Sequence, residues 1–322
     1  MSELLKNIDA RTKLAGTNKL EILLFMLGTD ARTGRRETFG INVFKVREVM
    51  RTPPITAAPE MPPSVEGMVS LRGALVPVVD LARYARIDTQ TPRSIMIVTE
   101  YAGHTQGFLV EGVDTILRLD WSQMRVPPAM LLAEMGGLVT AVTELPDGRL
   151  VMLMDVEKIL SETTNYDDEV VYRNIKPLDK PDLTVFFADD STVARRQIQR
   201  TLDAMGVKSQ AAINGREAWE ELEKVAAYAQ SSGQPVTDLI SLVLTDIEMP
   251  EMDGYILTKR IKSDPRFAGV PVIMHSSLSG MSNQQLGKSV GVDEYVPKFE
   301  PQRLSETLTR RLLGAGTAVQ LT

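Results

Sequence analysis

Residues 241–254, with the sequence SLVLTDIEMPEMDG, decide the fold of the second half of the chain. The short apolar run at residues 242–244 is typical of a strand that is buried on both faces of a parallel sheet. The strand ends in Asp246, and Pro250 and Gly254 then mark a loop. Because open α/β folds build their sites at the carboxyl edge of the sheet, the stretch predicts an exposed nucleophile or ligand at Asp246.

Strands and helices alternate on both sides of this stretch. The predicted strands are residues 184–188, 209–212, 239–246, 272–275 and 294–297, and the predicted helices are residues 192–205, 216–227, 255–261, 283–289 and 302–313. Such alternation predicts a doubly wound, five-stranded parallel sheet of the flavodoxin-like class. Residues 228–237 are expected to form a surface-loop extension.

Chemically active side chains follow four of these strands. They are Asp189, Asp190, Asp246, Ser276 and Lys298. The carboxyl ends of parallel strands meet at one edge, so we expect these side chains to converge. Three carboxylates in one cleft repel each other unless a cation joins them, and Mg²⁺ suits such oxygen ligands. Together with the lysine and the hydroxyl group, they predict in-line phosphoryl transfer onto Asp246.

Residues 183–313 resemble the receiver domain of response regulators. The matching motifs are FFADDS at 186–191, NGREAWE at 214–220, LTDIEMPEMDG at 244–254, PVIMHSS at 271–277 and GVDEYVPKF at 291–299. The resemblance implies that Asp246 is the phosphoacceptor. It also implies that Mg²⁺ is bound by Asp189, Asp190, Asp246 and the backbone carbonyl of Glu248.

The same resemblance assigns the residues that respond to phosphorylation. Ser276 is the switch hydroxyl, Tyr295 the switch aromatic residue and Lys298 the lysine that pairs with the phosphoryl group. Receivers usually have proline directly after this lysine, whereas here Pro297 precedes it and Phe299 follows it. We therefore expect the backbone of the loop after Lys298 to differ from that of other receivers. Serine also replaces the more common threonine at position 276.

The first half of the chain has the pattern of an all-β domain. The predicted strands are residues 21–27, 39–43, 67–71, 74–79, 94–99, 107–110, 138–142 and 150–154. Many short strands at this spacing indicate barrels or a sandwich. RGALVPVVD at residues 72–80 and DGRLVMLMD at residues 147–155 share the motif G-x-L-V-x-x-x-D. Two further pairs of motifs recur in the same order, at residues 40–50 and 107–117 and at residues 67–69 and 137–139. The sequence thus predicts two tandem copies of a β unit that form a pair of small barrels.

Residues 19–160 resemble the CheW-like adaptor domain, whose two SH3-like barrels agree with this repeat. FGINVFKVREVM at 39–50, EGMVSLRGALVPVVDL at 66–81 and LVMLMDVEKIL at 150–160 carry the resemblance. It implies that Arg72, in the LRG motif, contacts the cytoplasmic tip of a chemoreceptor, although an isolated arginine at a turn is more often a solvated residue. Glu48, in a segment that the family suggests is helix-like, is a weaker candidate for the same surface.

Composition argues against several other functions. The chain has 322 residues, a net charge of −6, no cysteine and two histidines, His104 and His275. It therefore lacks a basic surface for nucleic acid, a disulfide framework and the material for a histidine-rich metal site. No apolar run approaches the roughly 18 residues of a membrane span, so we expect a cytoplasmic protein without direct membrane insertion. The predicted parts are a leader at 1–18, an adaptor at 19–161, a linker at 162–182, a receiver at 183–314 and a tail at 315–322.

An adaptor of this class followed by a receiver resembles the CheV family of chemotaxis coupling proteins. The resemblance implies a non-enzymatic adaptor that joins chemoreceptors to a CheA-type histidine kinase in membrane receptor arrays, with coupling modulated by phosphorylation of Asp246. A phosphate sink held at the array is the alternative, and an inactive receiver kept for dimerisation is another. A phosphatase with Asp246 as nucleophile and Glu248 in a D-x-E arrangement is a remote third.

Overall fold

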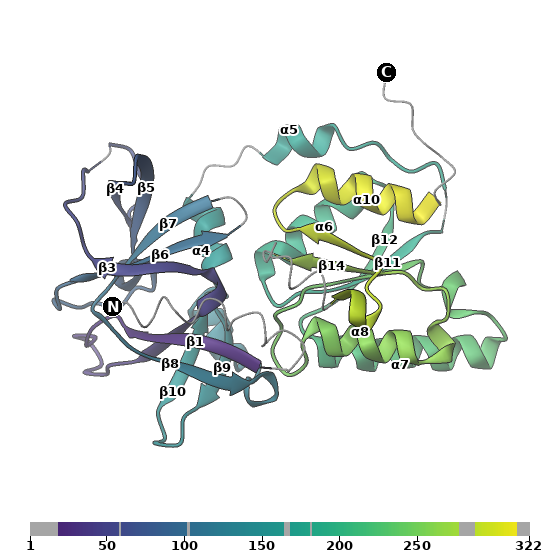
Figure 1. The fold of residues 1–322 in the computed structure, drawn as a ribbon, viewed down its shortest axis with the longest axis horizontal. Helices are drawn as coiled ribbons and strands as arrows, with labels where there is room; N and C mark the ends of the chain where they lie inside the picture. The colour runs from purple at the N-terminus through teal and green to yellow at the C-terminus, as the bar shows by residue number, and fades with distance from the viewer. Residues whose placement is uncertain are drawn as a thin grey trace. The chain divides into compact units, whose positions relative to one another are not determined.

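The structure, a computed structural model, describes residues 19–57, 59–101, 104–163, 168–180, 182–276 and 287–313. The chain divides into two compact units, one comprising Lys19–Asn165 and the other containing all described residues from Asp168 onward (Figure 1). The predicted leader and tail lie outside the described residues. None of the helices in the described part of the chain is both long and apolar enough to cross a membrane.

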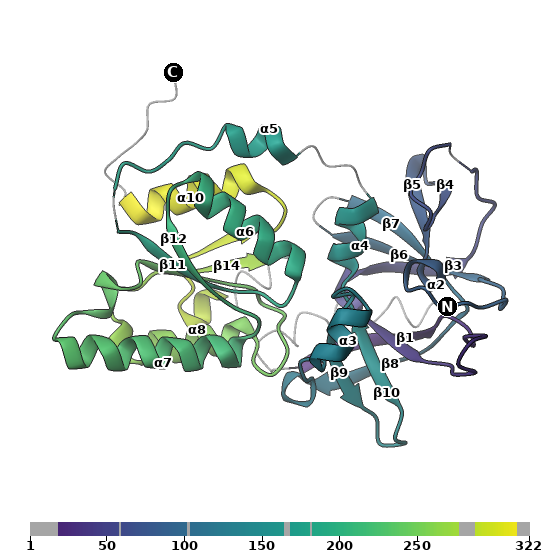
Figure 2. The ribbon, with the colours of Figure 1, turned by 180° about the vertical axis from the view of Figure 1, so that it is seen from behind.

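Two five-stranded sheets make up the first unit. The strand order of one is β8 (Gly112–Asp120), β1 (Lys19–Met26), β2 (Thr38–Asn42), β10 (Leu150–Met154) and β9 (Val139–Glu144). The order of the other is β3 (Val46–Arg51), β6 (Ile95–Tyr101), β7 (His104–Val110), β5 (Ala74–Asp80) and β4 (Val65–Leu71). Figure 2 shows both sheets from behind.

The predicted repeat is present, but its two copies do not fold separately. The first copy supplies β1 to β5 and the second supplies β6 to β10, yet β3 pairs with β6 and β8 pairs with β1. Each sheet also joins the copies through one parallel pair, β2 with β10 and β5 with β7. Each sheet therefore contains strands from both copies, and the two sheets have the same order once the copies are exchanged.

The sequence did not predict β3 and β8 as strands, because most of their side chains are only partly buried and show no clean alternation. The repeated aspartates of the motif begin two helices. Asp80 precedes α2 (Leu81–Tyr84) and accepts a hydrogen bond from the Arg83 amide at 3.1 Å. Asp155 precedes α4 (Val156–Thr163) and accepts from the Glu157 and Lys158 amides, both at 3.0 Å. These carboxylates satisfy amides that the first turn of a helix leaves without partners. This unit also contains helix α3 (Ala129–Glu134).

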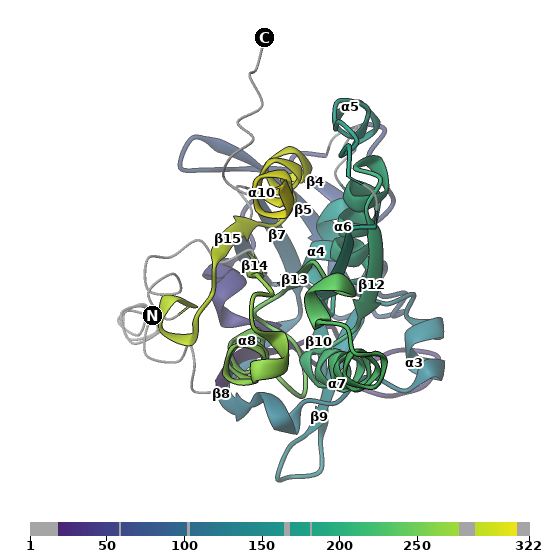
Figure 3. The ribbon, with the colours of Figure 1, turned by 90° about the vertical axis from the view of Figure 1, so that its right-hand side faces the viewer.

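The second unit contains a five-stranded parallel sheet. Its order is β12 (Lys208–Ala212), β11 (Thr184–Ala188), β13 (Leu242–Thr245), β14 (Val272–Ser276) and β15 (Glu294–Pro297). Alternate side chains of β11 enter two separate apolar cores. One face is covered by α7 (Gly215–Ser232) and α8 (Gly254–Ser263), and the other by α6 (Thr192–Ala204) and α10 (Pro301–Leu313) (Figure 3). The predicted doubly wound sheet is confirmed.

Three segments differ from the prediction. Helix α7 continues to Ser232 because Ala229 is still buried, and Gly233 then ends the helix at a φ of 70°, so residues 228–232 are not a loop. Strand β13 begins only at Leu242. The predicted linker contains helix α5 (Asp168–Arg173), which packs on the second unit. Most of the helix predicted at residues 283–289 lies outside the described residues.

Gly67 provides a test of the adaptor fold. Its φ is 145°, and a Cβ atom added there would lie 2.2 Å from the backbone oxygen of Thr56. We expect Gly67→Ala to destabilise this unit by about 2 kcal/mol, a typical cost of local backbone strain. Denaturant unfolding would be followed by the fluorescence of Trp121 in a Trp219→Phe background, because each unit contains one of the two tryptophans.

Gly112→Ala is the matched control. A Cβ atom added at Gly112 would meet nothing closer than 4.0 Å, and its φ is not in the left-handed region. Equal unfolding midpoints for the two variants would show that the close approach at Gly67 does not constrain the fold.

Candidate functional site

The predicted residues at the carboxyl edge of the parallel sheet come together. Asp189 follows β11, Asp246 follows β13 and Lys298 follows β15. The backbone amide of Asp246 donates to the Ala188 oxygen at 2.8 Å, which extends the sheet pairing to the site itself. The pairing of the strands thus fixes the backbone position of Asp246.

A buried ionic cluster is the centre of this site. The ammonium group of Lys298 lies 3.0 Å from an oxygen of Asp189 and 3.0 Å from an oxygen of Asp246. The exposed fractions of the three side chains are 2%, 0% and 5%. The sequence had suggested an exposed Asp246, and this prediction is wrong because the side chain is buried. Lys298 makes the burial of both carboxylates possible, because its positive charge offsets part of their negative charge.

The donor set fits a hard divalent cation. Carboxylate oxygens of Asp189, Asp190 and Asp246 lie within 4.8 Å of one another. With Lys298 the formal charge of the group is −2, and oxygen ligands are those that Mg²⁺ prefers. These three residues could therefore hold such an ion. The position of the Glu248 carbonyl in the ligand set stays a prediction.

Backbone groups orient both buried carboxylates. One oxygen of Asp246 accepts a hydrogen bond from the Ile247 amide at 2.7 Å, and the other faces Lys298. Asp189 likewise accepts from the Ser191 amide at 2.9 Å. The guanidinium group of Arg195 donates to the Asp189 backbone oxygen at 2.8 Å. The sequence reasoning missed Arg195, whose only signal is its position one turn inside the helix that follows Asp189.

Ser276 and Tyr295 lie in the same part of the fold. Ser276 ends β14 and is buried, and its backbone oxygen accepts from the Lys298 amide at 3.2 Å. Tyr295 is partly buried against Tyr255, with which it shares a hydroxyl hydrogen bond. Burial raises the pKa of both tyrosines, so both stay protonated at neutral pH. The switch roles of Ser276 and Tyr295 stay predictions.

The loop after the lysine has an unusual backbone. Phe299, which stands where receivers usually have proline, adopts a φ of 64°. This left-handed conformation is costly for a bulky residue and persists only where the surroundings impose it. Helix α10 begins two residues later, at Pro301. The Lys298 backbone and the start of α10 are thus joined by a strained, short connection.

Arg72 and Glu48 meet on the adaptor. Arg72 lies in the turn between β4 and β5 at a φ of 51°, and its side chain is 70% exposed. Its guanidinium group lies 3.0 Å from the Glu48 carboxylate. Glu48 belongs to β3, so the expected helix-like segment is wrong. The exposed Leu75, on the same hairpin, was not predicted. Arg72 is therefore an accessible cation, although it already has an internal partner.

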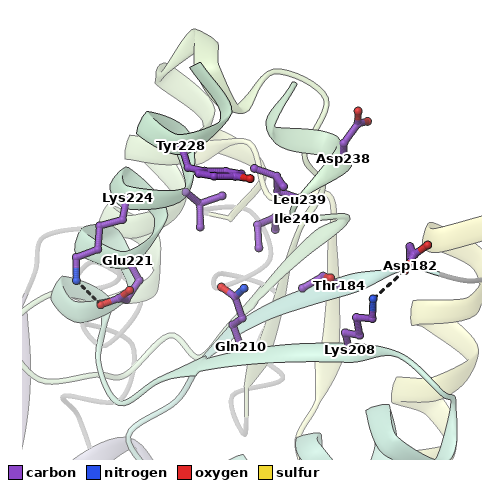
Figure 4. Close-up of a pocket in the computed structure, with 11 residues that line it drawn as sticks. Asp182, Thr184, Lys208, Gln210, Glu221, Lys224, Tyr228, Asp238, Leu239 and Ile240 are labelled. Carbon is purple, nitrogen blue, oxygen red and sulfur yellow. Dashed lines mark hydrogen bonds and ion pairs between the residues drawn. The ribbon is translucent and has the colours of Figure 1, made fainter. Parts of the chain in front are cut away.

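A hollow of about 570 Å³ lies elsewhere on the second unit (Figure 4). Helix α7 and the first residues of β11 and β12 line it, so it is near the amino ends of these strands, away from Asp246. Its two lysines are already paired, Lys208 with Asp182 and Lys224 with Glu221. It offers no group of convergent charges comparable to the acidic cluster.

Comparisons with known proteins match both units. The CheW-like domain model matches residues 21–164, and the response regulator receiver domain model matches residues 185–309. The Chemotaxis protein CheV1 of Helicobacter pylori is 28% identical over 97% of this chain and 99% of its own. The Chemotaxis protein CheW of Klebsiella aerogenes is 31% identical over 47% of this chain and 87% of its own. The Chemotaxis protein CheY1 of Helicobacter pylori is 35% identical over 39% of this chain and 94% of its own.

Removal of the Lys298 charge tests the ionic cluster. We expect Lys298→Ala to destabilise the second unit by about 3 kcal/mol in the presence of a chelator, because two buried carboxylates lose their cation. Added Mg²⁺ should restore more stability to this variant than to the wild type. Trp219 fluorescence in a Trp121→Phe background would report denaturant unfolding of this unit.

Lys208→Ala is the control, because its ion pair with Asp182 is largely exposed and contributes little. The cluster would have no structural role if the two lysine variants unfolded at the same denaturant concentration.

Proposed function

Since the chain belongs to the CheV-type chemotaxis coupling proteins, which join a CheW-like domain to a receiver domain, we propose that phosphorylation of Asp246 regulates its adaptor. The chain is a chemotaxis coupling adaptor with a receiver domain.

The contact of Lys298 with Asp246 carries this proposal. One oxygen of Asp246 is fixed by the Ile247 amide, and the other is held toward a buried cation. The second oxygen attacks the phosphorus of a phosphohistidine on the kinase. The new O–P bond forms as the P–N bond breaks, and the imidazole nitrogen keeps the electron pair. Catalysis consists of positioning and of neutralising charge, so no general base is required.

Asp189, Asp190 and Asp246, with the Glu248 carbonyl, would hold Mg²⁺, which supplies positive charge to the phosphoryl oxygens when bound. Lys298 then pairs with the phosphoryl group. Ser276, at the end of the neighbouring strand, donates its hydroxyl to the same group. Tyr295 reports the change because it packs against the apolar cluster that contains Ile247, the residue after Asp246.

On the adaptor we propose that Arg72 contacts the cytoplasmic tip of a chemoreceptor. Its exposure and its turn position leave the guanidinium group accessible to a carboxylate on a partner. Glu48 holds the side chain in place until that partner competes for it. The second partner is a CheA-type histidine kinase. We propose that the protein works in the cytoplasm, at membrane receptor arrays, and does not act as an enzyme.

The phosphate-sink alternative uses the same site but requires no effect on the adaptor. The phosphatase alternative has less support, since it explains neither Lys298 nor the adaptor. An inactive receiver kept for dimerisation would not need an ionic cluster oriented by backbone amides. The regulated adaptor accounts for both units of the chain.

Asp246→Asn should abolish labelling by phosphorylated kinase or acetyl phosphate, because the nucleophilic oxygen is replaced by an amide. Radiolabel incorporation would measure this, with Asp253→Asn as control, since Asp253 caps α8 in the same loop region. Normal labelling of Asp246→Asn would refute the site. In reconstituted arrays, kinase activity with the wild type should depend on its phosphorylation. Equal activity in both states would favour the sink.

Arg72→Glu should weaken recruitment to receptors at least tenfold and leave labelling of Asp246 unchanged, because it reverses the charge of an exposed side chain outside the receiver. Co-sedimentation with receptor-containing membranes would measure recruitment. Arg149→Glu is the control, because Arg149 is also exposed in an adaptor hairpin and paired with acidic residues. Equal losses in both variants would mean that net charge, and not the Arg72 surface, governs recruitment.

A further inference from the structure

The segment that leads into the receiver is part of the receiver's core. Tyr172 and Ile175 are 9% and 8% exposed and belong to the same apolar cluster as residues of α6 and α10. Helix α5 contacts both of these helices, and Figures 1 and 3 show it beside them. The face formed by α6 and α10 is therefore an interaction surface whose partner is the chain's own segment.

Several different contacts hold this segment. The Arg200 guanidinium group lies 4.1 Å from the centroid of the Tyr172 ring, a cation–π contact. The Leu178 amide donates to the Met205 oxygen at 2.8 Å. Yet α5 has only six residues, and a helix this short is unstable without packing. Its structure thus depends on the α6–α10 surface and is lost if that surface changes.

Both helices of this surface begin at the phosphorylation site. Ser191 caps α6, and its amide binds the carboxylate of Asp189. Helix α10 begins at Pro301, after Lys298 and the left-handed Phe299. A change in the Asp189–Lys298–Asp246 cluster therefore acts on the first turns of both helices. Among the described residues, the apolar cluster that includes α7 and α8 contains no side chain from the segment before the receiver.

We propose that residues 168–178 form a docking element that the receiver holds while Asp246 is unphosphorylated and releases on phosphorylation. This inference rests on the proposed function. The docked segment and the Lys298 bridge are present in the same structure. A phosphoryl group on Asp246 competes for Lys298 and so weakens the Lys298 bridge. It thereby favours the state in which residues 168–178 are released. Release would add residues 168–178 to the connection between α4 and β11.

Hydrogen–deuterium exchange of the full-length protein tests this release. With Mg²⁺ and fluoroberyllate, a phosphoryl analogue, amides of residues 168–178 should exchange at least fivefold faster than without fluoroberyllate. Asp246→Asn should show no such change. Fluorine NMR would establish whether fluoroberyllate is bound. Bound fluoroberyllate with unchanged or slower exchange would overturn the docking proposal alone, whereas no binding at all would overturn the site.

Two variants test the coupling in the reverse direction. Tyr172→Ala should speed exchange without fluoroberyllate and should tighten fluoroberyllate binding, because coupling between two sites is reciprocal. Arg200→Gln, which removes the cation–π contact between this exposed side chain and Tyr172, should change both the exchange rate and the fluoroberyllate affinity about threefold in the same directions. Arg200→Gln tests the coupling even if Tyr172→Ala does not fold. Lys176→Ala, an exposed neighbour, is the control, and unchanged fluoroberyllate affinity in Arg200→Gln would refute the coupling.

Discussion

The salt bridges from Lys298 to Asp189 and Asp246 are the interaction on which the receiver depends. They join the ends of three strands that are far apart in the sequence, and they bury a net charge that only a further cation can offset. The same lysine lies beside the start of α10, and the same Asp189 lies beside the cap of α6. A reaction at Asp246 must therefore disturb contacts that also hold the helices in place.

Much of the site could be predicted from the sequence, because each reactive residue follows an apolar strand. In a parallel sheet that position determines the edge at which the side chain lies, whatever the loop lengths. Burial of Asp246 could not be predicted in this way, since it results from Lys298, a residue more than fifty positions later. Arg195 was missed for a similar reason, because its role is to bind a backbone oxygen and no side-chain motif records it.

The adaptor shows where a repeat misleads. Periodic motifs identified two copies correctly, but they carry no information about which strands pair. Strands β3 and β8 have little alternation because they are only partly buried, and they form the antiparallel pairs that link the copies. The segment before the receiver was interpreted as a linker because, among its described side chains, only Tyr172, Ile175 and the partly buried Leu178 pack against the core, which is too few for a recognisable period.

The exchange of strands between the copies bears on how the protein is made. Strand β1 leaves the ribosome before the other strands of its sheet, but its neighbour β8 ends at Asp120, and β10, beside β2, ends at Met154. At about 5–20 residues per second, synthesis must continue for on the order of ten seconds before the first sheet can close. During that time β1 and β2 have open edges that can pair with other nascent chains. The strands of the receiver pair over shorter distances along the chain, so this delay is shorter there.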